Sequence, residues 1–120
     1  MGAAMFIGVF EGLFHLPSFF SPGSDQAATG LPVFVIGSMA GAIIFSWIFN
    51  KTMGSLLIVQ LFHIFVNTWI TLFAAAPADN VVTQWLFNGL IVLLAAAVVL
   101  VFGARRLSRK PPLALAIVNY

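Results

Sequence analysis

The sequence predicts an all-α protein, a polytopic membrane bundle of about four transmembrane helices. Of its 120 residues 62% are hydrophobic and 7% are charged, and the mean hydropathy is +1.10. A soluble domain averages about 25% charged residues, so this composition excludes a water-soluble fold. Four apolar segments approach or reach the length of about 20 residues that crosses a bilayer. Helices are the single-segment structures that satisfy their own backbone hydrogen bonds in lipid.

Clusters of turn-forming residues separate these four segments. The predicted helices cover about residues 3–20, 31–49, 54–76 and 81–103. The sequence Ser-Pro-Gly-Ser-Asp follows the first helix, Asn-Lys-Thr-Met-Gly the second, and Pro77, Asp79 and Asn80 the third. Proline and glycine in such clusters end helices and form turns. We therefore expect a transmembrane bundle over residues 1–103 and a basic cytoplasmic tail over residues 104–120.

The placement of charge predicts the orientation. Lys51 lies between the second and third segments, and the other four bases follow the fourth. With four crossings all five bases fall on one side of the membrane, and Asp25 and Asp79 fall on the other. The positive-inside rule makes the basic side cytoplasmic. We expect a multi-pass protein of a bacterial cell membrane with both termini cytoplasmic, whose partners include the lipid bilayer and no nucleic acid.

Two of the apolar segments carry a polar stripe. In the first, Glu11 and His15 are four residues apart and share a helix face. The third carries a longer stripe with spacings of three, four and four, made of Gln60, His63, Asn67 and Thr71. An ionisable residue in a spanning segment costs about 2.5–3.5 kcal/mol on insertion scales, so it indicates function. We expect the two stripes to face each other or a shared cavity.

Some of these polar residues have a structural interpretation. Hydrogen bonding between helices is the favoured role for Gln60 and Thr71, and close helix packing is favoured for the small residues Gly37, Ser38, Gly41 and Ser46. A metal site is weakly indicated: zinc would draw on His15 and His63 with Glu11 and, more weakly, Asn67, and an HExxH helix is absent. The alternative is acid–base chemistry, in which a histidine carries a proton and Asn67 stabilises an oxyanion.

Two stretches of the sequence resemble a known family. Residues 12–20, GLFHLPSFF, resemble the second motif of the CPBP intramembrane proteases, which include the CAAX prenyl endopeptidases and the bacteriocin-processing (Abi) proteins. Residues 47–68, WIFNKTMGSLLIVQLFHIFVNT, resemble the later motifs, in which a basic-Thr-x-Gly-Ser turn leads into a helix carrying His-x-x-x-Asn. The likeness covers about residues 12–68, with the motifs in matching order.

The resemblance implies an activity and a set of catalytic residues. The activity is that of an intramembrane endopeptidase, a hydrolase that cleaves a peptide or prenylated-protein substrate near the membrane surface. The implied catalytic residues are His15, His63 and Asn67. Mechanism in the family is described both as that of an intramembrane metalloprotease and as that of a glutamic endopeptidase, so zinc is a candidate cofactor and His15 and His63 its candidate ligands.

The sequence departs from the family at the first motif. The Glu-Glu-x-x-x-Arg pattern is absent, and the sole glutamate, Glu11, stands where the family usually has Phe or Trp. We expect Glu11 to orient the imidazole of His15, with surrogate base as the less favoured role. We also expect this chain to be the C-terminal portion of a longer protease and to be inactive alone. Two other functions stay open: a non-catalytic membrane protein with an immunity or scaffold role, and a small proton-relaying transporter subunit.

Overall fold

The computed structural model describes residues 2–21, 30–74 and 80–103, and it has no β-strand within these ranges. Four α-helices and one short 3₁₀-helix account for most of them. They are α1 (Gly2–Phe14), η1 (Leu16–Phe20), α3 (Leu31–Lys51), α4 (Leu56–Ala74) and α5 (Asn80–Phe102). The all-α prediction is confirmed, and each predicted apolar segment corresponds to one helix or, for the first, to α1 together with η1.

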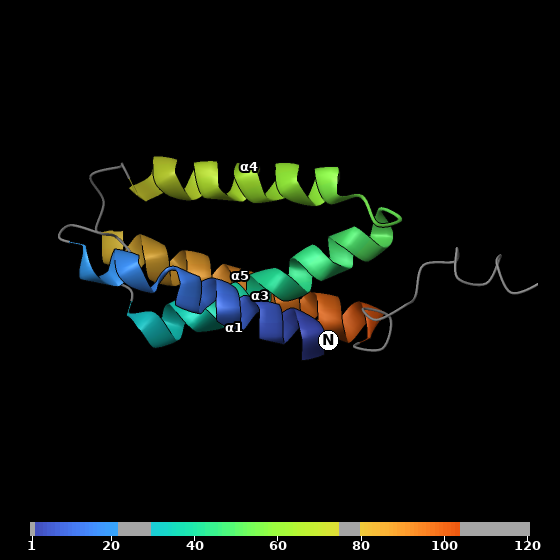
Figure 1. The fold of residues 1–120 in the computed structure, drawn as a ribbon, viewed down its shortest axis with the longest axis horizontal. Coiled ribbons are helices and arrows are strands. Elements are labelled where there is room, and N and C mark those ends of the chain that lie inside the picture. The colour runs from blue at the N-terminus through green and yellow to red at the C-terminus, as the bar shows by residue number, and fades with distance from the viewer. Residues whose placement is uncertain (1, 22–29, 75–79, 104–120) are drawn as a thin grey trace, which may run out of the picture.

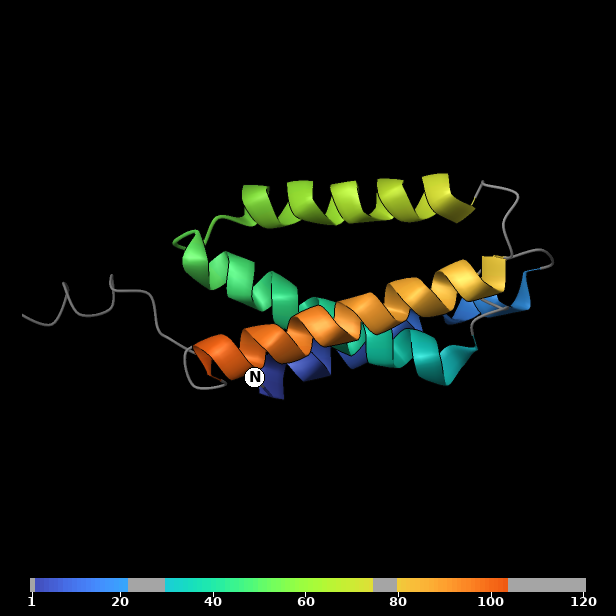
Figure 2. The same cartoon turned by 180° about the vertical axis from the view of Figure 1, so that it is seen from behind.

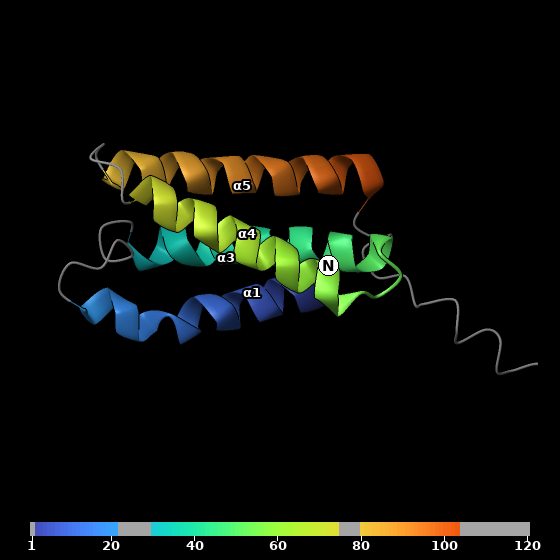
Figure 3. The ribbon, with the colours of Figure 1, turned by 90° about the horizontal axis from the view of Figure 1, so that it is seen from above.

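Three of the helices form a layer and the fourth lies across it. Viewed from above, α3 lies between α1 and α5 (Figure 3). In the side view α4 runs along one face of this layer (Figure 1), and the view from behind shows the same arrangement (Figure 2). Successive helices run in opposite directions. As a result α1 begins at the end of the bundle where α3 and α5 finish.

Small residues on α1 allow it to pack closely against α3. Ala4, Gly8 and Gly12 follow one another at intervals of four and are buried. A Cβ atom on Gly8 would lie 2.5 Å from the Cα of Met39, and one on Gly12 would lie 3.0 Å from Val35. Such close approach of backbones drives helix association in membranes, where lipid offers no hydrophobic force between helices.

Close packing was predicted for the small residues of α3, and there the outcome is mixed. Gly37 does lie against a neighbour, because a Cβ atom there would collide with the carboxamide oxygen of Asn88 on α5. Gly41 does not, since a Cβ atom at that position would meet nothing within 4 Å. Close approach between two helix backbones is made instead by the glycines of α1, at Gly8 and Gly12.

The outer surface of the bundle is apolar, as expected for contact with lipid. Large hydrophobic side chains are highly exposed, among them Phe14 at 86% and Leu100 at 84%. In the part of the chain that the structure describes, three segments are long and apolar enough to cross a membrane, namely Gly2–Phe20, Leu31–Lys51 and Val81–Phe102. The apolar stretch of α4, Leu56–Leu72, is shorter. These features fit an integral membrane protein, and a crossing by α4 stays a prediction.

The turn between α3 and α4 explains the Lys-Thr-Met-Gly-Ser sequence. The hydroxyl of Thr52 donates to the carbonyl oxygen of Ile48 at 2.9 Å and so caps the end of α3. Gly54 adopts φ +87°, a left-handed conformation that favours glycine, and its N–H bonds the carbonyl of Phe49 at 2.8 Å. The Ser55 hydroxyl then accepts the N–H of Ile58 at the start of α4. This turn sends α4 back across the layer.

The end of the bundle that holds this turn also holds the end of α5. The ammonium of Lys51 lies 4.8 Å from the ring centroid of Phe102, a cation–π contact. The predicted tail over residues 104–120, and the loop acids Asp25 and Asp79, lie outside the described residues.

Candidate functional site

A cavity of about 410 Å³ lies between α4 and the layer of the other three helices. Its walls come from all four α-helices and include a set of polar side chains in an otherwise apolar bundle. The polar lining residues are Glu11, His15, Ser38, His63, Asn67, Thr71, Gln84 and Asn88. The two polar stripes predicted from the sequence therefore share one cavity, with the exception of Gln60, which is exposed and does not line it.

His15 lies at the point where α1 ends. Pro17 has no N–H to continue the α-helical hydrogen bonds, so the chain tightens into the 3₁₀-helix η1 directly after His15. The Nδ1 atom of His15 lies 2.9 Å from the backbone carbonyl oxygen of Glu11. A carbonyl can accept only, so the ring donates through Nδ1, and with a single ring proton it presents Nε2 as a hydrogen-bond acceptor. The ring also contacts Phe34, with centroids 5.3 Å apart.

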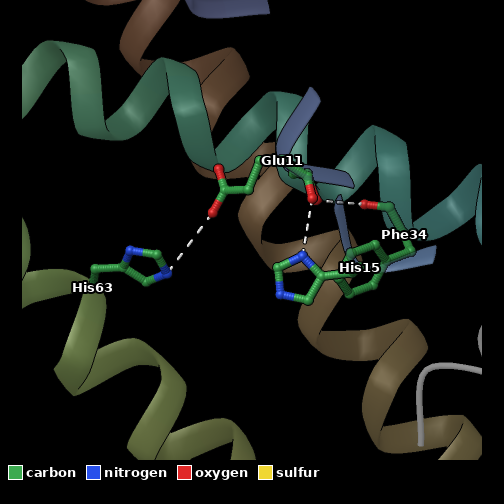
Figure 4. Close-up of polar contacts among 5 residues, drawn as sticks. Glu11, His15, Phe34 and His63 are labelled. Carbon is green, nitrogen blue, oxygen red and sulfur yellow. Dashed lines mark hydrogen bonds and ion pairs between the residues drawn. The ribbon is translucent and has the colours of Figure 1, made fainter. Parts of the chain in front are cut away.

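The carboxylate of Glu11 faces His63 on α4 rather than His15 (Figure 4). Its Oε1 atom lies 3.8 Å from Nε2 of His63, and the side chains are 31% and 33% exposed. This distance is within ion-pair range and too long for a direct hydrogen bond. The sequence predicts that Glu11 orients the imidazole of His15. In the structure the backbone carbonyl of Glu11 contacts His15, whereas the carboxylate extends from α1 across the cavity to His63.

His63 and Asn67 lie one turn apart on α4. The imidazole of His63 stacks on Phe45 of α3, with ring centroids 4.9 Å apart and planes inclined by 35°. Asn67 is exposed to the cavity, and its carboxamide makes no hydrogen bond with a described residue. Its backbone carbonyl accepts the hydroxyl of Thr71 at 2.9 Å, which satisfies that hydroxyl within the helix. The carboxamide of Asn67 is thus available as a donor to a bound molecule.

Two cavity residues on α5 were not predicted from the sequence. Gln84 and Asn88 are four residues apart and line the cavity opposite α4. The signal that identified His63 and Asn67, polar residues at helical spacing in an apolar segment, was present here too. In this segment the polar spacing is a weaker signal, because a long run of Leu, Ala and Val follows it.

The cavity does not provide a metal site. No group of three His, Asp or Glu side chains within residues 2–21, 30–74 and 80–103 could hold a metal ion. Zinc usually takes at least three protein ligands, so this part of the chain does not fit it.

The family of the chain is given by comparison of its sequence with known proteins and families. No curated protein and no solved structure matches the chain. A family model described as type II CAAX prenyl endopeptidase Rce1-like does match, over residues 1–69. The match includes His15, His63 and Asn67 and ends before α5 begins. Because it covers more than half of the 120 residues, the chain belongs to the type II CAAX prenyl endopeptidase family, Rce1-like.

Proposed function

We propose that this chain contributes the histidines and the asparagine of an intramembrane endopeptidase site that cleaves a prenylated or membrane-proximal peptide. The observation that carries the proposal is the shared cavity: His15, His63 and Asn67 line one hollow within an apolar bundle. Such a hollow can exclude lipid and admit water together with a peptide, which hydrolysis in a membrane requires. Family membership supports a peptide as the substrate.

The geometry suggests a role for each residue. His15 presents Nε2 as an acceptor, fixed by its bond to the Glu11 carbonyl, and so can relay a proton to the leaving amine once a separate base has activated the water. Asn67 offers N–H donors to the oxygen of the tetrahedral intermediate. The carboxylate of Glu11 lies within ion-pair range of His63 across the cavity and can orient its ring when the two approach each other around a bound substrate. Glu11 is therefore a positioning residue in this proposal.

The test is cleavage of an S-farnesylated peptide ending in Cys-Val-Ile-Ala. The chain is expressed together with a segment carrying a Glu-Glu-x-x-x-Arg motif, which the given sequence lacks. We expect His15→Ala and Asn67→Ala each to lower the rate by about 10²-fold or more, as removal of an acid–base group or an oxyanion donor does. Gln60→Leu, an exposed residue of α4 outside the cavity, is the matched control and should keep the rate. If His15→Ala and Asn67→Ala cleave the peptide as fast as Gln60→Leu and the wild type do, the proposal is refuted.

A second function, proton relay in a transporter subunit, is favoured by one observation. Glu11 and His63 are two titratable groups in contact across the cavity, as in membrane proton pathways. A relay predicts proton flux through liposomes containing the purified chain, lost in His63→Ala and independent of any peptide. An endopeptidase predicts no such flux.

A further inference from the structure

The carboxamides of Gln84 and Asn88 have no evident structural role in the bundle. Both belong to α5, a 23-residue helix that is otherwise almost entirely apolar, and both are half-buried at the cavity wall. Polar groups in a membrane helix are costly unless they bond to another helix or to a ligand. Neither side chain forms a hydrogen bond to another helix within the described residues. The bond that Asn88 does make is to the backbone carbonyl of Gln84, on α5 itself, at 2.8 Å.

The packing around Asn88 fixes its orientation. Its amide nitrogen is held by the Gln84 carbonyl, and its Oδ1 atom occupies the space above Gly37 of α3 that a Cβ atom would fill. If Asn88 served to join the helices, a polar partner would be expected opposite it, and α3 presents a glycine there instead. The absence of a side chain at position 37 makes room for the carboxamide oxygen. Because the Gln84 carbonyl accepts one of the two N–H groups of Asn88, the second N–H group is left for another partner.

The position of these amides relative to the histidines suggests what they bind. They line the cavity from α5, whereas His63 and Asn67 line it from α4. A substrate in the cavity would therefore meet His63 and Asn67 from α4 and the carboxamides of Gln84 and Asn88 from α5. A carboxamide offers both a donor and an acceptor, which are the two groups that the main chain of an extended peptide presents.

We propose that Gln84 and Asn88 bind the main chain of the substrate peptide and position its scissile bond toward His15, His63 and Asn67. This inference rests on the proposed function and adds the part of the site that recognises the peptide backbone irrespective of side chains. It assigns a binding role to α5, which lies beyond residues 1–69 of the family match.

The test is binding of two fluorescent peptides to the full chain in lipid nanodiscs. One is the S-farnesylated peptide ending in Cys-Val-Ile-Ala, and the other is the same peptide N-methylated at the amides after the Cys. We expect the wild type to bind the unmodified peptide about three- to tenfold more tightly, the effect of about one hydrogen bond. In Gln84→Met, which keeps the length of the side chain, the preference should fall by about threefold, and in the double variant Gln84→Met/Asn88→Leu it should fall to about one. Thr83→Val, next to it and outside the cavity lining, should keep the preference.

A glycine substitution tests the orientation of Asn88 without changing a polar residue. Gly37→Ala places a methyl group where the Asn88 oxygen lies, so it should weaken binding of the unmodified peptide as Asn88→Leu does. Gly41→Ala, where the methyl group meets nothing within 4 Å, should not. Circular dichroism and gel filtration report whether each variant is folded, and Gln84→Met alone decides the question if the variants at 37 and 88 do not fold.

The outcomes separate this inference from the function on which it rests. Equal binding of both peptides by the wild type, or a preference that is undiminished in Gln84→Met, overturns main-chain recognition and leaves the endopeptidase proposal intact. If the wild type binds neither peptide, both main-chain recognition and the endopeptidase proposal are overturned. Gln84 and Asn88 would then contact water in the cavity and no peptide.

Discussion

At the scale of single residues, the two histidines of the site contact different polar groups of Glu11. Its backbone carbonyl holds the ring of His15 on α1, and its carboxylate reaches His63 on α4. One residue thus contacts both histidines, through different atoms and in different ways. Removing the carboxylate should therefore affect His63 and spare His15.

This division predicts the response to Glu11→Gln. Because the chain has two histidines, NMR spectra of the ring nitrogens contain two sets of signals, which His15→Gln would assign. We expect Glu11→Gln to shift the ring signals of His63 and to leave those of His15 nearly unchanged, since the backbone carbonyl remains. A change confined to His15 would contradict the structure and restore the orienting role inferred from the sequence.

The residues at the site show what a sequence can reveal of such a cavity. The helical spacing within each stripe identifies His15, His63 and Asn67, because residues three or four apart share a face whatever the helix packs against. The partner of the Glu11 carboxylate could not be predicted, because it depends on how α4 is rotated and placed relative to α1. The roles of these residues in catalysis stay predictions.

At the scale of secondary-structure elements, the position of α1 depends on its small residues. The backbones of α1 and α3 approach so closely at Gly8 that an added Cβ atom would lie 2.5 Å from the Cα of Met39. A contact of that length must be relieved by moving one helix, because the neighbouring atom belongs to the backbone. His15 and Glu11 are on the same helix, so such a movement would also displace the site.

Two matched glycine substitutions test this packing. Gly8→Ala should destabilise the bundle by about 1–3 kcal/mol, the usual cost of overpacking. Gly41→Ala adds the same methyl group in open space and should be neutral or stabilising by up to about 1 kcal/mol, because alanine has the higher helix propensity. The measurement is loss of helical circular dichroism during titration with sodium dodecyl sulfate. Equal stability of the two variants would show that α1 and α3 are further apart than described.

The boundaries of the elements follow from the sequence more completely than their contacts do. The turn around Gly54 predicts the break between α3 and α4. In contrast, α1 ends at Phe14, inside the stretch predicted as one helix over residues 3–20, because Pro17 interrupts the α-helical hydrogen bonds. These signals act through local backbone geometry. The close approach of Gly8 to α3 was not foreseen, because a glycine at helical spacing does not identify the helix that it will contact.

At the scale of the whole molecule, the arrangement of the helices bears on topology. The start of α1 and the ends of α3 and α5 lie at one end of the bundle, where Lys51 contacts Phe102 (Figure 1). If α4 also crosses the membrane, this end is the one that the positive-inside rule assigns to the cytoplasm. Reporter fusions after Thr29 and after Asp79 should then behave as external, and a fusion after Lys110 as internal. A cytoplasmic signal from the fusion after Asp79 would contradict four crossings.

The last prediction concerns the activity of the chain alone. A water nucleophile needs a base within hydrogen-bond reach, and the single glutamate of the sequence has its carboxylate 3.8 Å from His63. A site without a free base keeps substrate binding and oxyanion stabilisation and loses most of its rate. We therefore expect the purified chain to bind the farnesylated peptide without hydrolysing it, and to cleave it once the segment with the Glu-Glu motif is supplied. Hydrolysis by the chain alone, abolished in Glu11→Gln, would refute this prediction and make Glu11 the catalytic base.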